Sequence, residues 1–171
     1  HVHNQISPVY DSSIIETELI LSDLESVENR LENIAKRLKT GDKALKGQIE
    51  ILEDVKSTLA MSKPARSLIG RYENSVWDQL HLLTSKPVLY ACNVLEKDAA
   101  SGNNFTELMI QKCKTDGQKY VIISSKIEQD IALLENDQEK LEFLNSINLK
   151  ESALSKIVKE LYHLLALRSF F

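Results

Sequence analysis

The run Val88-Leu89-Tyr90-Ala91-Cys92 decides the fold of this chain, together with Asn93-Val94-Leu95-Glu96, which follows it. A second continuous apolar run, Tyr120-Val121-Ile122-Ile123, comes later and ends in Ser124-Ser125-Lys126. Between the two runs, residues 105–114 have the pattern of a helix. Continuous apolar strands joined by a helical crossover are typical of a parallel sheet that is covered on both faces. The sequence therefore predicts a strand, helix, strand unit with polar residues at both carboxyl ends, where ligands bind in open α/β sheets.

Amphipathic segments flank this unit on both sides. A short helix is expected over residues 75–83, before Lys86-Pro87 and the first strand. Three more are expected after the second strand, over residues 127–134, 138–144 and 152–167.

The first part of the chain predicts a helical hairpin. Ser13 and Glu16 match a capping box, so a helix should begin near residue 12. Apolar residues then recur at alternating spacings of four and three, as in a heptad repeat: Ile20, Leu24, Val27, Leu31, Ile34 and Leu38. Gly41-Asp42 breaks this helix, and a second stripe follows that Lys56 interrupts: Leu45, Ile49, Leu52 and Leu59. Such a short connection makes the helices antiparallel, which predicts a coiled-coil hairpin over residues 12–62, ended by Pro64.

The predicted tip of the hairpin is basic. Its cationic residues are Lys36, Arg37, Lys39, Lys43 and Lys46, with Asp42 as the only close acid. Solvation and the helix dipole explain cations at the end of the first helix, but not those that open the second. Two interpretations stay open, a solvated tip and a patch that contacts RNA or the ribosome.

Composition and charge exclude several classes of protein. The chain has 43% hydrophobic and 27% charged residues, as an ordinary globular protein does, and a net charge of −4 argues against a wholly basic nucleic-acid binder. No apolar run is long enough to span a bilayer and no signal peptide is evident, so we expect a cytoplasmic protein with no membrane partner. Cys92 and Cys113 lack a Cys-x-x-Cys pattern and should be reduced thiols. His1 and His3 have no third ligand in reach, so no metal site is predicted.

Several motifs occur together in an order that carries a family resemblance. They are Asn93-x-x-Glu96 after a Lys-Pro-strand, Ser124-Ser125-Lys126, Gly41-Asp42-Lys43 at the hairpin tip, Lys63-Pro64-Ala65-Arg66-Ser67, and Leu167-Arg168-Ser169-Phe170-Phe171. Over the whole chain this pattern resembles the YchF or Obg-like ATPase family of translation-factor-class P-loop NTPases. The resemblance implies an α/β fold, the C-terminal half of a P-loop NTPase domain that carries an inserted antiparallel α-helical coiled-coil hairpin. Residues 1–11 would end the first NTPase segment, 12–62 form the hairpin and 63–171 form the second NTPase segment.

The resemblance also implies an activity whose catalytic part is missing from this sequence. Neither a Gly-x-x-x-x-Gly-Lys-Ser/Thr phosphate loop nor an Asp-x-x-Gly metal motif occurs. We therefore expect the intact protein to be a monomeric, ribosome-associated enzyme that hydrolyses ATP, or GTP, with Mg²⁺. This chain alone should be inactive, because it contains neither catalytic residues nor Mg²⁺ ligands. It would begin after the phosphate loop and stop before a C-terminal TGS domain.

The predicted base-binding residues are Asn93, Val94, Leu95, Glu96, Ser124, Ser125 and Lys126. Guanine-reading relatives have Asn-Lys-x-Asp, in which the carboxylate accepts hydrogen bonds from two guanine donors. Val94 and Glu96 replace the lysine and the aspartate, whereas an amide such as that of Asn93 pairs with N6 and N7 of adenine. The pattern thus favours ATP, with the backbone of Ser124 and Ser125 closing the pocket beside Lys126. The alternative is a coiled-coil interaction module without nucleotide activity.

Overall fold

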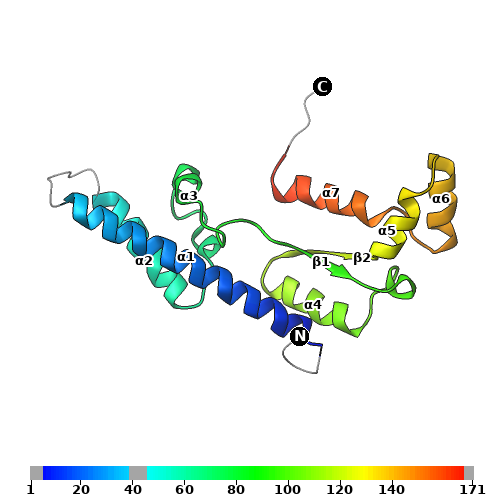
Figure 1. Cartoon of the computed structure of the whole chain (residues 1–171), viewed down its shortest axis with the longest axis horizontal. Helices are drawn as coiled ribbons and strands as arrows, with labels where there is room; N and C mark the ends of the chain where they lie inside the picture. Colours follow the sequence, from blue (N-terminus) through cyan, green and yellow to red (C-terminus); the bar gives the residue numbers. More distant parts are fainter. Residues whose placement is uncertain (1–5, 39–45, 168–171) are drawn as a thin grey trace. The chain divides into compact units, whose positions relative to one another are not determined.

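The computed structural model describes residues 6–38 and 46–167, which divide into two compact units (Figure 1). The helical unit comprises the described residues of 10–86. The α/β unit comprises the described residues of 1–9 and 87–171. Residues 63–86, which the family resemblance places in the second NTPase segment, belong to the helical unit.

Two helices dominate the helical unit, α1 (Pro8–Leu38) and α2 (Lys46–Ala60), followed by the 3-10 turn η2 (Ala65–Leu68) and by α3 (Asn74–Leu80). The helix starts before residue 12, and the predicted capping box is wrong. Ser13 lies inside α1 and its hydroxyl donates to the Tyr10 carbonyl at 2.7 Å, while Glu16 pairs with Arg66 at 3.1 Å. Proline at the first helical position explains the earlier start, because its fixed φ suits the helix and its missing N–H would be unpaired there.

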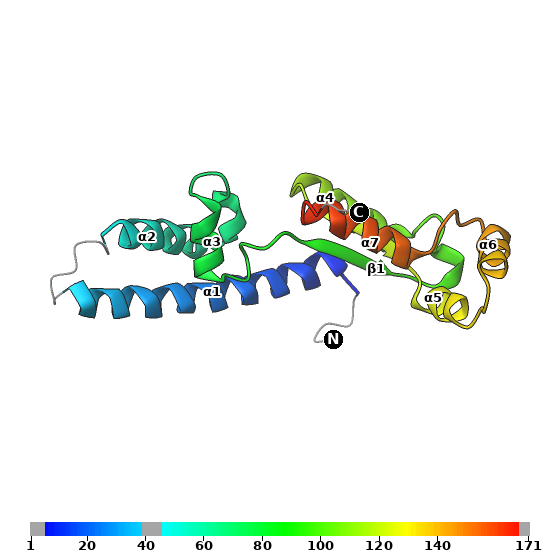
Figure 2. The ribbon, with the colours of Figure 1, turned by 90° about the horizontal axis from the view of Figure 1, so that it is seen from above.

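The core of the helical unit follows the predicted stripe of α1 closely. Helices α1 and α2 lie side by side and share one apolar cluster (Figures 1 and 2). Its buried members are Ile20, Val27, Leu52, Val55, Leu59, Ala65, Trp77, Leu80 and Leu82, and Leu24, Leu31 and Ile34 pack against them. Val55, which the stripe of the second helix omitted, takes the place beside Lys56, and the Lys56 ammonium pairs with Glu28 of α1 at 3.1 Å. Where they are described, the two helices thus share one apolar core, whereas Leu45 and the Gly41-Asp42 break lie outside the described residues.

The α/β unit contains the predicted strand, helix, strand arrangement. Strand β1 (Leu89–Asn93) leads through η3 (Glu96–Asp98) and α4 (Asn104–Thr115) to β2 (Lys119–Ile123). The strands pair in parallel, from Leu89 opposite Lys119 to Asn93 opposite Ile123. Helices α5 (Ser125–Ala132), α6 (Asp137–Ser146) and α7 (Ala153–Leu164) follow.

Helix α4 begins with a capping box. The Asn103 side chain accepts from the Thr106 backbone N–H at 3.1 Å, and Thr106 Oγ1 accepts from the Asn103 N–H at 2.7 Å. Helix α4 contacts both strands, and α7 contacts β2. Val121 is buried in β2, but no residue of β1 is fully buried, so the described part of the sheet is less covered than predicted. A sheet of two described strands has too little apolar surface to bury both faces.

Candidate functional site

The carboxyl ends of the two strands are joined by the side chain of Asn93, the last residue of β1. Its Oδ1 accepts hydrogen bonds from the Ser125 backbone N–H and from Ser125 Oγ, both at 3.0 Å. Beside this link, the Val94 N–H donates to the Ile123 carbonyl at 2.8 Å. The register causes the meeting, because Asn93 lies opposite Ile123 and Ser125 opens helix α5 just after it.

These two bonds determine which hydrogen-bonding groups of the Asn93 amide remain available to a ligand. A carboxamide oxygen accepts through two lone pairs, and Ser125 occupies both. The Nδ2 group is the part of this exposed side chain that remains to donate to a ligand acceptor. The geometry therefore differs from the predicted two-point contact with N6 and N7, and it favours a single donation from Nδ2.

Ser124 presents a buried hydroxyl next to this link. The residue is 3% exposed, and its Oγ has no hydrogen-bond partner among the described residues. It occupies the N-cap position of α5, yet its side chain makes no capping bond. A buried hydroxyl without a partner is uncommon in folded proteins, because its desolvation is not compensated. The sequence pattern predicted a contact through the backbone of both serines, and nothing in it indicated the role of the Ser124 and Ser125 hydroxyls.

Charged groups stand around the same strand ends. Lys126 pairs with Asp130, one turn along α5, at 2.7 Å. The pKa of the Lys126 ammonium is raised, chiefly by this hydrogen bond, then by the charge of Asp130, and also by the charge of Glu96. Glu96, at the start of η3, is thus near enough to act electrostatically on Lys126, and both side chains are exposed. The start of α5 adds the partial positive charge of a helix N-terminus.

The apolar members of the predicted site also stand at this edge. Val94 is half-buried, whereas Leu95 is 65% exposed. The structure thus brings Asn93, Val94, Ser124 and Ser125 together by sequence position and hydrogen bonds, with Glu96 and Lys126 coupled by charge. An exposed leucine beside unpaired polar groups suits a flat ligand with polar edges.

The predicted basic tip is only partly described. Lys36 is exposed on α1, but Lys39 and Lys43 lie outside the described residues and the side chains of Arg37 and Lys46 are not described. Across residues 6–38 and 46–167, no group of three His, Cys, Asp or Glu side chains is arranged to hold a metal ion. His1 and His3 lie outside that range. Over the same range, no helix is long and apolar enough to cross a membrane.

Both cysteines are free thiols, as predicted. Cys92 lies half-buried on β1 and Cys113 is buried on α4. Burial raises the pKa of each thiol, and the nearby Cys92 raises that of Cys113 further. The thiols are therefore protonated, and weak nucleophiles, near neutral pH.

Comparison with known proteins gives a consistent set of relatives. No family model matches the chain. Along its whole length, it is 36% identical over 174 residues to the ribosome-binding ATPase YchF of Bacillus subtilis and 34% identical over 172 residues to that of Haemophilus ducreyi. It spans about half of these relatives, 47% of each. The solved structure of the Schizosaccharomyces pombe YchF GTPase matches 96% of the chain with a TM-score of 0.82 and 30% identity, and the chain covers 46% of it.

Proposed function

We propose that this chain, which is part of a protein of the YchF family, supplies the base-binding end of the nucleotide site in a longer ATP-hydrolysing protein. The observation that carries the proposal is the pair of 3.0 Å hydrogen bonds from Ser125 to Asn93 Oδ1. They fix the Asn93 amide at the joined carboxyl ends of two parallel strands, the place where open α/β sheets bind ligands.

The chemistry of this edge favours adenine. The Asn93 Nδ2 group donates to N7 of the base, and the Glu96 carboxylate accepts from the adenine N6 amine. Guanine presents an acceptor, O6, where adenine has that amine, and a carboxylate repels it. Leu95 supplies apolar surface for a face of the base, and the buried Ser124 Oγ lacks a hydrogen-bond partner among the described residues. ATP is therefore the proposed nucleotide, with GTP as the weaker ligand.

Hydrolysis itself is assigned to residues outside this sequence. Phosphoryl transfer needs a phosphate-binding loop and Mg²⁺ to neutralise developing charge on the terminal phosphate. The sequence has neither the loop motif nor the metal motif. The chain's own part is to bind and orient the base, so by itself it is proposed to be inactive.

The helical unit is the proposed contact with the ribosome. The curated relatives are named ribosome-binding ATPases, and α1 and α2 pack in one core as an inserted hairpin would. The proposed insertion covers residues 12–62, and its basic tip would meet ribosomal RNA in the cytoplasm. An interaction module without nucleotide activity is the second candidate, and it too would use α1 and α2.

Nucleotide titration of the intact protein tests the base site. We expect tighter binding of a fluorescent ATP analogue than of its GTP counterpart. Asn93→Ala should weaken ATP binding by about tenfold or more, since it removes the Nδ2 donor and both Ser125 bonds. Asn145→Ala is the matched control, because Asn145 is exposed on α6. GTP preference would refute the adenine argument, and an Asn93→Ala variant that binds ATP as the control does would refute the site.

Charge reversal tests the ribosome contact. Replacing the five basic residues of the tip by glutamate should release the intact protein from ribosomes in sedimentation, and wild-type binding should fall steeply with salt. The variants carry Lys36→Glu, Arg37→Glu, Lys39→Glu, Lys43→Glu and Lys46→Glu together. Unchanged sedimentation would eliminate the basic tip as the contact.

A further inference from the structure

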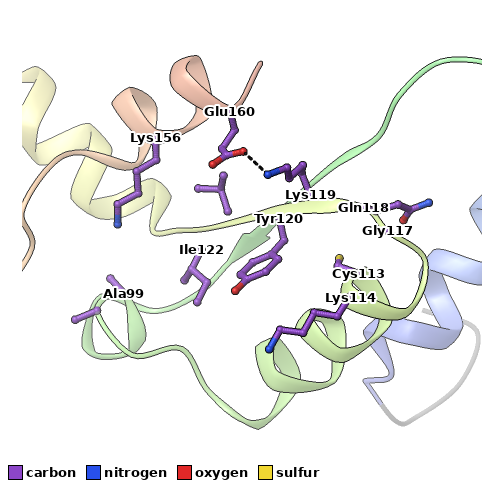
Figure 3. Close-up of a pocket in the computed structure, with 12 residues that line it drawn as sticks. Ala99, Cys113, Lys114, Gly117, Gln118, Lys119, Tyr120, Ile122, Lys156 and Glu160 are labelled. Carbon is purple, nitrogen blue, oxygen red and sulfur yellow. Dashed lines mark ion pairs between the residues drawn. The ribbon is translucent and has the colours of Figure 1, made fainter. Parts of the chain in front are cut away.

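A cavity of about 560 Å³ follows the edge of β2 that lies away from β1 (Figure 3). Residues 118–122 line it without a gap, whereas no residue of β1 does. Cys113 and Lys114 line it from α4, and Lys156 and Glu160 from α7. Ala99 stands at one end and Gly117 at the other, so the cavity is a groove along β2 from Lys119 to Ile122.

Hydrogen-bonding groups of the backbone face this groove. In a strand, each residue directs its N–H and C=O to one side, and successive residues alternate. The Ile123 carbonyl accepts a hydrogen bond from the Val94 N–H. The backbone N–H and C=O of Ile123, and by alternation those of Val121, are therefore directed toward β1. Tyr120 and Ile122 then direct their groups to the outer edge. Among the described residues, no backbone hydrogen bond from outside the strand ladder reaches either of them.

The rim of the groove is positive. Lys114 and Lys156 have no ion-pair partner among the described residues, and Figure 3 shows both side chains directed to the open space around Tyr120 and Ile122. Lys119 pairs with Glu160 at 3.5 Å, which neutralises the one acid in the lining. Within the described part of the chain, two cations without an ion-pair partner thus flank a strand edge whose outward donors and acceptors are unused.

We propose that this groove binds an extended acidic peptide segment, which adds to β2 as a further strand. Strand addition uses main-chain hydrogen bonds for affinity and pockets beside alternate side chains for specificity. Tyr120 and Ile122 provide the main-chain groups. Because successive side chains of an added strand point to opposite faces, the acidic ones meet one wall, with Lys114 on α4 or Lys156 on α7, and the apolar ones meet the other wall. The predicted partner is an extended segment of another protein in which acidic and apolar residues alternate.

A labelled short peptide of alternating glutamate and valine is the probe, titrated into the intact protein by fluorescence anisotropy. We expect saturable binding that Lys114→Glu with Lys156→Glu weakens by about tenfold or more, because like charges then face each other. Lys150→Glu is the matched control, since Lys150 is exposed and does not line the groove. A peptide of alternating lysine and valine should not bind. The glutamate peptide has two sets of alternate backbone nitrogens, of which one faces β2 in the complex. N-methylation of that set should abolish binding, and N-methylation of the other set should not.

Amide hydrogen exchange gives a second readout that does not depend on the variants. Peptide addition should protect the amides of Tyr120 and Ile122, while that of Val121 is already protected by β1. Absent binding, or equal binding of the lysine peptide, overturns the proposal. Protection of the Tyr120 and Ile122 amides before any peptide is added overturns the proposal too. Protection that is independent of protein concentration would mean that the protein's own chain covers the edge. Protection that rises with protein concentration would mean that a second copy covers it.

Discussion

Replacing Asp23 by alanine should destabilise the helical unit more than any other loss of a single acid on α1. Asp23 is 3% exposed, and its carboxylate accepts three hydrogen bonds. Two come from the backbone N–H groups of Leu83 and Thr84, at 2.8 and 2.7 Å, and the third from Thr84 Oγ1 at 2.6 Å. Thr84 Oγ1 accepts in turn from the Ala65 N–H at 3.0 Å. One carboxylate therefore ties α1 to two later segments of the unit.

The size of the effect follows from these bonds. A hydrogen bond to a charged group contributes about 1.5–3 kcal/mol, and each buried donor left without a partner costs about 1–3 kcal/mol. Asp23→Ala leaves two backbone donors unpaired, so we expect the free energy of unfolding to fall by about 3–5 kcal/mol. Asp23→Asn keeps one acceptor oxygen but turns an NH₂ group toward a donor, and should lose about 2–3 kcal/mol. The free energy of unfolding of a folded domain is about 5–15 kcal/mol in total, so either loss is large.

Native-state hydrogen exchange of the helical unit is the appropriate assay, because the chain has two units and its unfolding need not be two-state. Amides of α1 and α2 report the free energy of opening, and those of Leu83 and Thr84 report the local bonds. Glu25→Ala is the control, since Glu25 is exposed on the same helix and should change stability by less than about 0.5 kcal/mol. An Asp23→Ala variant within about 1 kcal/mol of that control would refute the estimate from the three bonds.

Three further predictions concern other parts of the chain. Gly102→Ala should lower the stability of the α/β unit by about 2–4 kcal/mol in urea unfolding, because φ is +78° there and a Cβ would collide with Thr106 Oγ1. By contrast, a Cβ at Gly47 meets nothing within 4 Å, so Gly47→Ala should stabilise helix α2 by about 0.5–1 kcal/mol. The pKa of Tyr72 is raised, chiefly by its 2.7 Å hydrogen bond to Asp54. This bond therefore stabilises the fold below pH 10.0, and the stabilisation is lost as pH rises through the folded-state pKa. Ultraviolet titration of Asp54→Ala should show a lower Tyr72 pKa than that of the wild type. Iodoacetamide should alkylate the two cysteines slowly at neutral pH and much faster in urea, and equal rates by mass spectrometry would contradict their burial.

Periodicity predicted most of the fold because it reports directly on burial. The continuous apolar runs became paired parallel strands, and the helix between them begins within one residue of its predicted start. The seam of α1 was predicted through Ile20, Leu24 and Val27, since spacing alone places these residues on one face. Boundaries were less predictable, as Pro8 overrode the capping signal at Ser13.

Polar burial could not be predicted from spacing. The predicted stripe of the first helix contains apolar residues alone and so omits Asp23, although Asp23 follows Ile20 by three residues and lies on the buried face of α1. Its partners, Leu83 and Thr84, are remote in sequence, and nothing local in their sequence marks them. In the candidate site, residue identities were predictable from the strand ends, whereas the use of both Asn93 Oδ1 lone pairs by Ser125 depends on the pairing of the two strands.

One register sets both the candidate base site and the groove. Because Asn93 lies opposite Ile123, the Ser125 amide comes within reach of Oδ1, and the same alternation turns Tyr120 and Ile122 to the outer edge. A shift of the pairing by one residue would move every β2 side chain to the other face of the sheet. It would also direct the backbone N–H and C=O of Val121, in place of those of Tyr120 and Ile122, to the outer edge. The crossover between β1 and α4 contains η3 and the Asn103–Thr106 box, and Gly102 within it lies beside Ile122 of β2. Gly102, whose added Cβ would approach Thr106 and Ile122 together, is therefore the position where a single methyl group should perturb base binding and peptide binding at once.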